Sequence, residues 1–241
     1  MSAYLQMGHD TENLVGADDL DEFTGIILSP VNRDPKQIAE KMPVFRKAGD
    51  YDIVLDPQLY IPRGNREHLV MQPYFPATFD TTDFSSPEGW TDIVRRLSMF
   101  AGDLGVDAVA SPVIMPRRWT SKFYDTSVET SRMLSAEVGE SMRVLTTCLV
   151  SLSELASANH AREIGSIMTR HETGGFYIVL HTDIDPRREI SDPVGLASFM
   201  YLISLLQRHA PVTVAYSSSD MLLFKADGPV KSRLTVFVKK Y

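Results

Sequence analysis

Short, almost continuously apolar runs alternate with amphipathic stretches along most of this chain. Such runs are typical of strands that are buried on both faces of a parallel sheet. The sequence predicts strands at residues 23–29, 51–56, 106–111, 143–150, 176–181, 212–216 and 234–238. It predicts helices at residues 35–48, 87–105, 125–139, 151–170, 193–209 and 220–226. This alternation of strands and helices favours parallel pairing and an α/β fold.

Several of the predicted helices begin with recognisable capping residues. Asp34 and Asp192 each precede a proline, which suits the first helical position because its missing N–H group is not needed there. Ser151 and Glu154 have the spacing of a capping box, in which each side chain satisfies a main-chain N–H group of the other residue. We therefore expect helices to begin just after Asp34, Ser151 and Asp192.

These elements give six strand–helix steps and a seventh strand, one strand fewer than an eight-stranded barrel needs. We predict a TIM-barrel-like parallel β/α fold that is incomplete or modified at its C-terminal end. Residues 68–75 are the alternative source of another strand, although no helix separates them from the strand at 51–56. An unclosed sheet edge would offer a template for pairing with a partner protein or a second copy of the chain.

The chain divides into a short polar segment and one long domain. Residues 1–22 hold six acidic residues and no lysine or arginine, and they predict a flexible acidic leader. Residues 23–241 predict a single barrel-like domain, for which their length is sufficient.

Composition narrows the class of protein. The single cysteine, Cys148, excludes an internal disulfide and a cysteine-rich zinc site. The start of the chain lacks a signal-peptide pattern, and the longest nearly apolar stretch, residues 195–206, is too short to cross a membrane. We therefore predict a cytoplasmic protein without membrane contact. A net charge of −7 argues against non-specific coating of nucleic acid, which needs a positive surface.

Arginines follow the ends of several predicted strands. Apolar runs end in Ser-Pro or Asp-Pro steps at residues 29–30, 56–57, 111–112 and 185–186, and arginine comes within a few residues of each. Because ligands of parallel α/β folds bind beyond the carboxyl ends of the strands, these arginines predict an anion site there. The substrate-binding candidates are Arg63, Arg66, Arg117, Arg118, Arg187 and Arg188. The alternative is that each arginine forms a local ion pair with a neighbouring glutamate.

A second group of candidates comes from the motif His181-Thr182-Asp183-Ile184-Asp185. In an extended chain His181, Asp183 and Asp185 would share one side, where they could hold a divalent cation or supply a general base. Asp56, at the end of another predicted strand, is the expected distal carboxylate. We predict Asp56, His181 and Asp183 as catalytic residues, with turn formation and helix capping as the alternative, and the metal and cofactor stay unassigned.

Aromatic residues complete the predicted site. Residues 56–86 form a long segment with several aromatic rings, and loops of this length are usually lids or binding loops. We predict that Tyr60 and Trp119 form walls of the site, by stacking on a flat ring or a cation. The alternative is that these rings cover one end of the barrel as a small additional core.

These observations predict an enzyme that acts on a small anionic substrate, phosphorylated or nucleotide-like, by hydrolysis or group transfer. The sequence lacks the Walker loop, the G-x-G-x-x-G fingerprint, G-x-S-x-G and H-E-x-x-H. The first alternative is a non-catalytic, barrel-derived subunit that docks a partner protein through an open edge. The second is an enzyme that modifies a flipped nucleic-acid base, which the negative net charge disfavours.

Overall fold

Eight parallel strands form a closed barrel at the centre of the molecule. The computed structural model describes residues 2–8, 23–61, 67–76, 87–182, 192–216 and 234–237. The strands are β1 (Ser2–Gln6), β2 (Phe23–Leu28), β3 (Asp52–Leu55), β4 (Ala108–Ala110), β5 (Arg143–Ser151), β6 (Gly175–His181), β7 (Val212–Ala215) and β8 (Leu234–Phe237). Each strand pairs in parallel with the next one in the sequence, and β8 pairs with β1.

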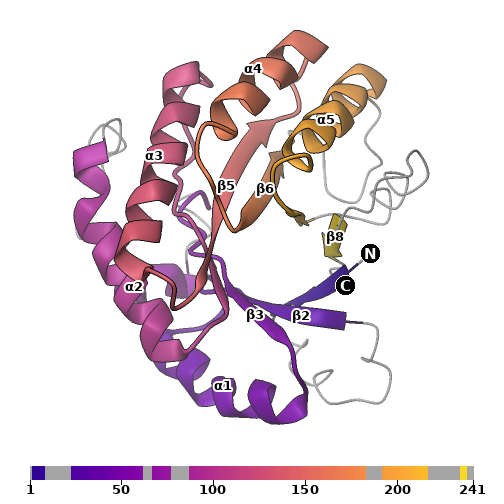
Figure 1. The fold of residues 1–241 in the computed structure, drawn as a ribbon. Coiled ribbons are helices and arrows are strands. Elements are labelled where there is room, and N and C mark those ends of the chain that lie inside the picture. The colour runs from indigo at the N-terminus through magenta and orange to yellow at the C-terminus, as the bar shows by residue number, and fades with distance from the viewer. Residues whose placement is uncertain are drawn as a thin grey trace.

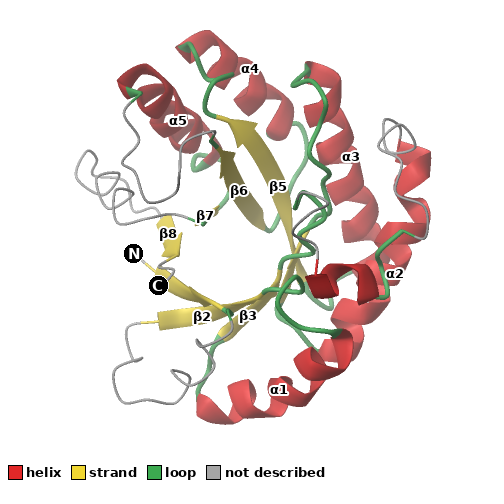
Figure 2. Cartoon of the chain, turned by 180° about the vertical axis from the view of Figure 1, so that it is seen from behind, coloured by secondary structure: helices red, strands yellow, loops and turns green. Residues whose placement is uncertain are grey.

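Helices cover part of the outside of this barrel (Figure 1). They are α1 (Pro35–Ala48), α2 (Thr91–Leu104), α3 (Ser121–Val138), α4 (Ala158–Met168) and α5 (Pro193–Leu206), with 3-10 helices η4 (Glu67–Met71) and η5 (Pro87–Trp90). Figure 2, from the opposite side, shows the strands inside the arc of helices. The predicted TIM-barrel-like α/β fold is confirmed in its modified form, because within the described residues α5 is the last helix and only the short β7 and β8 follow.

The eighth strand comes from the segment that we expected to be a flexible leader. Ser2–Gln6 lies between β2 and β8, so the leader prediction is wrong for these residues. The hydroxyl of Tyr4 donates to the Asp52 carboxylate, and Gly25 in β2 leaves room for the Tyr4 ring, which an added Cβ would overlap. Because β1 and β8 pair with each other, the open sheet edge that we expected for partner docking is occupied.

Residues 68–75 do not supply a strand. Most of this segment lies in η4 and the turns that follow it, where Leu69 and Tyr74 are fully buried. The hydroxyl of Tyr74 donates to the carbonyl oxygen of Pro57 at 3.2 Å, which ties this segment to the residues after β3. The long connection after β3 therefore contains a packed piece of core at residues 67–76.

Two of the three predicted helix starts are confirmed. Asp34 forms a capping box with Gln37 at the start of α1, and Asp192 accepts main-chain N–H groups at the start of α5. The third start is wrong, because Ser151 is the last residue of β5 and α4 is capped by Ser157 instead. The residues between β5 and α4 form turns, so the capping-box spacing at Ser151 does not begin a helix there.

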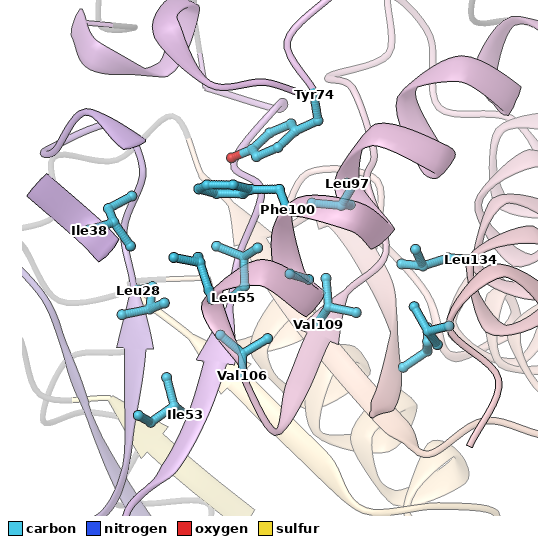
Figure 3. Close-up of a cluster of buried hydrophobic side chains, with 14 of the residues drawn as sticks. Leu28, Ile38, Ile53, Leu55, Tyr74, Leu97, Phe100, Val106, Val109 and Leu134 are labelled. Carbon is cyan, nitrogen blue, oxygen red and sulfur yellow. The ribbon is translucent and has the colours of Figure 1, made fainter. Parts of the chain in front are cut away.

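The largest core lies between the strands and the helices (Figure 3). Leu28, Leu55 and Val109 extend from β2, β3 and β4 toward the helices, where Ile38 of α1 and Leu97 of α2 meet them. Each of these side chains is almost completely buried, and burial of one such side chain contributes about 1.5–3 kcal/mol. Among the described residues, no helix is long and apolar enough to cross a membrane.

Candidate functional site

A separate apolar cluster fills the inside of the barrel. Strand side chains alternate between its two faces, and those that face inward include Ile27, Val54, Ala110 and Tyr177. These side chains fill the interior of the barrel, which is therefore a packed core and not an open channel. We call the end of the barrel reached by the carboxyl ends of the strands the mouth, and the polar residues discussed below lie there.

Asp56 is the centre of a hydrogen-bonded group at the mouth. It follows β3 directly and is fully buried. Its carboxylate accepts hydrogen bonds from the hydroxyls of Tyr60 at 2.5 Å, Tyr177 at 2.8 Å and Tyr216 at 3.3 Å. It also accepts the main-chain N–H of Gln58 at 3.0 Å. We call these five residues the carboxylate cluster.

The side chain of Gln58 connects this cluster to the residues that follow β2. Its amide nitrogen donates to the hydroxyl of Tyr216 at 2.5 Å and to the hydroxyl of Ser29 at 2.9 Å. Its amide oxygen accepts the N–H of Val31 at 2.9 Å. Residues that follow β2, β3 and β7 therefore hold one another in place around Asp56.

Two members of the cluster have strained backbones. Gln58 and Tyr216 both have a φ angle of 55°, in the left-handed region that non-glycine residues seldom occupy. Each such conformation costs about 1–3 kcal/mol and persists where the surrounding structure enforces it, most often at functional sites. Tyr216 as a whole residue is 38% exposed while its hydroxyl lies within the cluster, so this residue connects Asp56 to the surface.

Burial controls the electrostatics of the cluster. It raises the pKa of Asp56 above its usual value of 3.8, although the hydrogen bonds from Tyr60 and Tyr177 act in the opposite direction. Burial and the negative charge of Asp56 raise the pKa of both tyrosines. The phenols therefore stay protonated and donate to Asp56.

A second group at the mouth is aromatic. The Trp119 ring stacks on His181 with centroids 6.2 Å apart and an angle of 25° between the planes. Phe123 meets Trp119 edge to face at 5.6 Å. Trp119 and Phe123 also pack against the barrel interior, in the same apolar cluster as Tyr60. The aromatic group and the carboxylate cluster therefore border the same interior.

A cavity of about 300 Å³ lies beside this aromatic group, between the connection that follows β4 and helix α3. We call it the loop pocket. It is lined by Trp90, Pro112, Val113, Ile114, Met115, Pro116, Arg117, Arg118, Thr120, Lys122, Phe123, Thr126, Ser127 and Thr130. Among the described residues of this lining, three side chains are cationic and none is acidic.

The structure divides the predicted site residues into three groups. Asp56 and Tyr60 are hydrogen-bonded in the carboxylate cluster, His181 and Trp119 stack on each other, and Arg117 and Arg118 line the loop pocket. The remaining predictions lie outside the described residues: Asp183, Arg63, Arg66, Arg187 and Arg188.

Within the described residues, no group of three or more histidine, cysteine, aspartate or glutamate side chains could hold a metal ion. Asp183 and Asp185, which the sequence motif pairs with His181, lie outside the described residues. The divalent-cation hypothesis therefore stays a prediction.

Sequence reasoning missed Gln58, Tyr177 and Tyr216 as partners of Asp56. The signal for Tyr177 was strand parity, because it lies two residues before Val179 and so faces the barrel interior with it. A buried phenol needs a hydrogen-bond partner, and an inward-facing carboxylate on another strand is the natural one.

The fold and the position of this site at the mouth define a TIM-barrel type of protein. No protein-family model matches the chain, and no curated protein matches its sequence. A chitinase from Bacteroides thetaiotaomicron is similar in structure, with TM-score 0.51 and 13% identity over 88% of this chain and 67% of that chain.

Two further solved structures share the fold. The N-acetylneuraminate lyase from Mycoplasma synoviae has TM-score 0.50 and 11% identity over 97% of this chain and 69% of its own. The putative copper homeostasis protein CutC from Streptococcus agalactiae has TM-score 0.52 and 10% identity over 99% of this chain and 100% of its own. At such low identity, these similarities establish the fold and nothing further.

Proposed function

We propose that this protein is an enzyme that exchanges a proton with an anionic substrate at the mouth of the barrel, during hydrolysis or group transfer. The observation that carries the proposal is the carboxylate cluster. Asp56 directly after β3, Tyr60 and Gln58 in the connection that follows it, and Tyr216 directly after β7 meet at the carboxyl ends of these strands, and Tyr177 reaches Asp56 from within β6. Catalytic groups of barrels of this type lie at that end.

A purely structural role explains the cluster less well. Burying a carboxylate costs several kcal/mol in real proteins, and each strained φ angle adds about 1–3 kcal/mol. Hydrogen bonds to a charged group return about 1.5–3 kcal/mol each. Apolar side chains of similar volume would fill the same space without the cost of burying a charge, so we attribute the cluster to chemistry.

The proposed roles follow from the contacts. Asp56 acts as general acid or base, through Tyr216, an exposed residue whose hydroxyl lies 3.3 Å from the carboxylate. Tyr60 and Tyr177 hold the carboxylate in place. In hydrolysis or group transfer, this proton would go to the leaving-group oxygen or come from the attacking hydroxyl or water.

Binding of the anion is assigned to arginine. Arg117 and Arg118 are exposed at the loop pocket and can form paired hydrogen bonds with phosphate or carboxylate. His181 and Trp119 form the neighbouring wall. On sequence grounds only, we also propose four more anion-binding residues, Arg63, Arg66, Arg187 and Arg188. On the same grounds we propose Asp183 as a second catalytic residue.

The test is a turnover screen of the purified chain against phosphate esters and nucleotides, followed by substitution. We expect Asp56→Asn to lower kcat at least about 100-fold, as general acid–base catalysis contributes about that factor or more. Tyr216→Phe should lower kcat in the same direction, while the exposed Asp103→Asn is the matched control. An Asp56→Asn variant that is correctly folded and retains full turnover would refute the proposal.

A further inference from the structure

We infer that the loop pocket binds the apolar body of an amphipathic organic anion, such as an aromatic phosphate ester or carboxylate, with its charged group on Arg117 and Arg118. The inference rests on the proposed function for its anion and adds the class of molecule that carries it. Three observations support it: the chemistry of the pocket wall, the cations around it, and its position beside the mouth.

The buried wall of the pocket is apolar. Trp90, Val113 and Ile114 are at most 7% exposed, and they contribute ring and aliphatic surface. A cavity of about 300 Å³ is at the lower end of the range for small-molecule sites, which are mostly apolar with a few polar groups. The wall therefore suits an aromatic ring or a short acyl chain.

Helix α3 contributes hydroxyl-bearing residues to the wall, but their hydrogens are already donated. Thr126 donates to the carbonyl oxygen of Lys122 at 2.9 Å, and Thr130 donates to that of Thr126 at 2.8 Å. Ser127 donates to the carbonyl oxygen of Thr147 on β5 at 2.7 Å. Because these donors are used inside the protein, α3 presents mainly methyl and methylene groups to an occupant.

The charged residues that line the pocket within the described part of the chain are all cationic. Arg117, Arg118 and Lys122 are exposed, and no ion pair joins them to an acidic residue in the part of the chain that the structure describes. By contrast, Arg46 and Arg170 pair with Asp107 and Asp125. Cations beside an apolar cavity fit a ligand that has a negative group and an apolar body.

The pocket also borders the proposed reaction centre. Val113 belongs both to the pocket wall and to the apolar cluster inside the barrel, which contains Tyr60 and Tyr177. Phe123 lines the pocket and meets Trp119 at the mouth. An occupant of the loop pocket would therefore contact Val113, which belongs to the apolar cluster of the barrel interior, and Phe123, which meets the aromatic group at the mouth.

The test compares three probes by isothermal titration calorimetry: naphthyl phosphate, inorganic phosphate and naphthol. Naphthyl phosphate has both the body and the charge, whereas each of the other probes has only one of them. We expect naphthyl phosphate to bind at least about tenfold more tightly than either, since burying an aromatic ring adds to the charge interaction. Equal affinities for naphthyl phosphate and inorganic phosphate would overturn the inference.

Variants locate the binding. Thr126→Leu, on α3, fills part of the pocket and should remove the preference for naphthyl phosphate over inorganic phosphate. If Thr126→Leu folds poorly, Met115→Phe fills the pocket from the connection after β4 and should have the same effect. Alanine at both Arg117 and Arg118 should weaken both phosphate probes about tenfold or more, while Arg208→Ala removes an exposed charge elsewhere as control. Unchanged affinity in both filling variants would also overturn the inference.

Asp56→Asn separates this inference from the proposed function. We expect that variant to bind naphthyl phosphate as the wild type does, because Asp56 does not line the pocket. If the wild type fails to bind the probe but Asp56→Asn still removes turnover of a true substrate, the pocket assignment is wrong and the proposed function stands. If the wild type binds the probe but Asp56→Asn retains turnover, the pocket assignment stands and the proposed function is wrong.

Discussion

Replacing Asp56 by asparagine should change how the stability of the protein depends on pH. Burial raises the pKa of Asp56 in the folded protein above the ordinary value of 3.8. Between these two pKa values the folded protein binds more protons than the unfolded chain, so the free energy of unfolding falls as pH rises. The stabilising contribution is complete below the unfolded pKa and is lost as pH rises through the folded one. Asparagine does not titrate, so the variant lacks this slope.

The size of the effect follows from one proton. A single-proton difference changes the free energy of unfolding by at most about 1.4 kcal/mol for each pH unit between the two pKa values. In a domain of this length, that corresponds to a change in Tm of about 4 °C per pH unit. The variant should therefore become more stable relative to the wild type as pH rises from about 4 toward the folded pKa of Asp56.

Urea denaturation of both proteins, at several pH values from about 4 to about 7, measures this difference directly. Asp92 and Glu129 have pKa values lowered by neighbouring arginines, and they titrate in both proteins, so their contributions cancel in the comparison. A stability difference that stays constant with pH, or that changes in favour of the wild type as pH rises, would refute the account of Asp56 as a buried, raised-pKa carboxyl.

Three further experiments test the packing. Leu55→Ala should cost about 2–5 kcal/mol in urea denaturation because the side chain is fully buried, while Val44→Ala, at a 52% exposed site, should cost less than about 0.5 kcal/mol. Gly25→Ala should lower Tm because the added methyl overlaps the ring of Tyr4 in β1. Gly102→Ala in α2 meets no neighbouring atom and should raise the free energy of unfolding by up to about 1 kcal/mol. Equal Tm values for the two variants would contradict this. Burial raises the pKa of Cys148 to about 12, so a thiol reagent should label it only after denaturation, and rapid labelling of the native protein would show that this part of the core opens.

The strands that the sequence predicted well are those with a long local signal. The run at 143–150 corresponds to Arg143–Ser151, since its apolar and β-branched residues suit a buried strand wherever it pairs. Ser2–Gln6 has no such run, and it is a strand because β2 and β8 lie on either side of it. Contacts between residues so distant in sequence leave little trace in a local pattern.

In the candidate site, too, the residues with a local sequence signal could be predicted and those defined by distant contacts could not. Asp56 could be chosen from sequence because it ends an apolar run before a proline. Strand parity places Tyr177 on the inner face, but it does not identify its partner, because a tyrosine within an apolar strand looks like an ordinary core residue and its bond to Asp56 spans 121 positions. The positive φ angles of Gln58 and Tyr216 are likewise enforced by tertiary contacts, and neither residue type favours that conformation by itself.

The pairing of β1 with β8 has a consequence for how the barrel assembles. Ser2 is the partner of Thr235, so the last seam of the sheet joins residues that are separated by almost the whole sequence. Such distant pairings form late and slowly, because a very large loop must close first. As the chain is synthesised, β1 can pair with β2 long before β8 exists, and its other edge then stays open. Intermediates with this unpaired edge are the species most prone to aggregate. Conditions that slow the pairing of β1 with β8 should therefore increase aggregation.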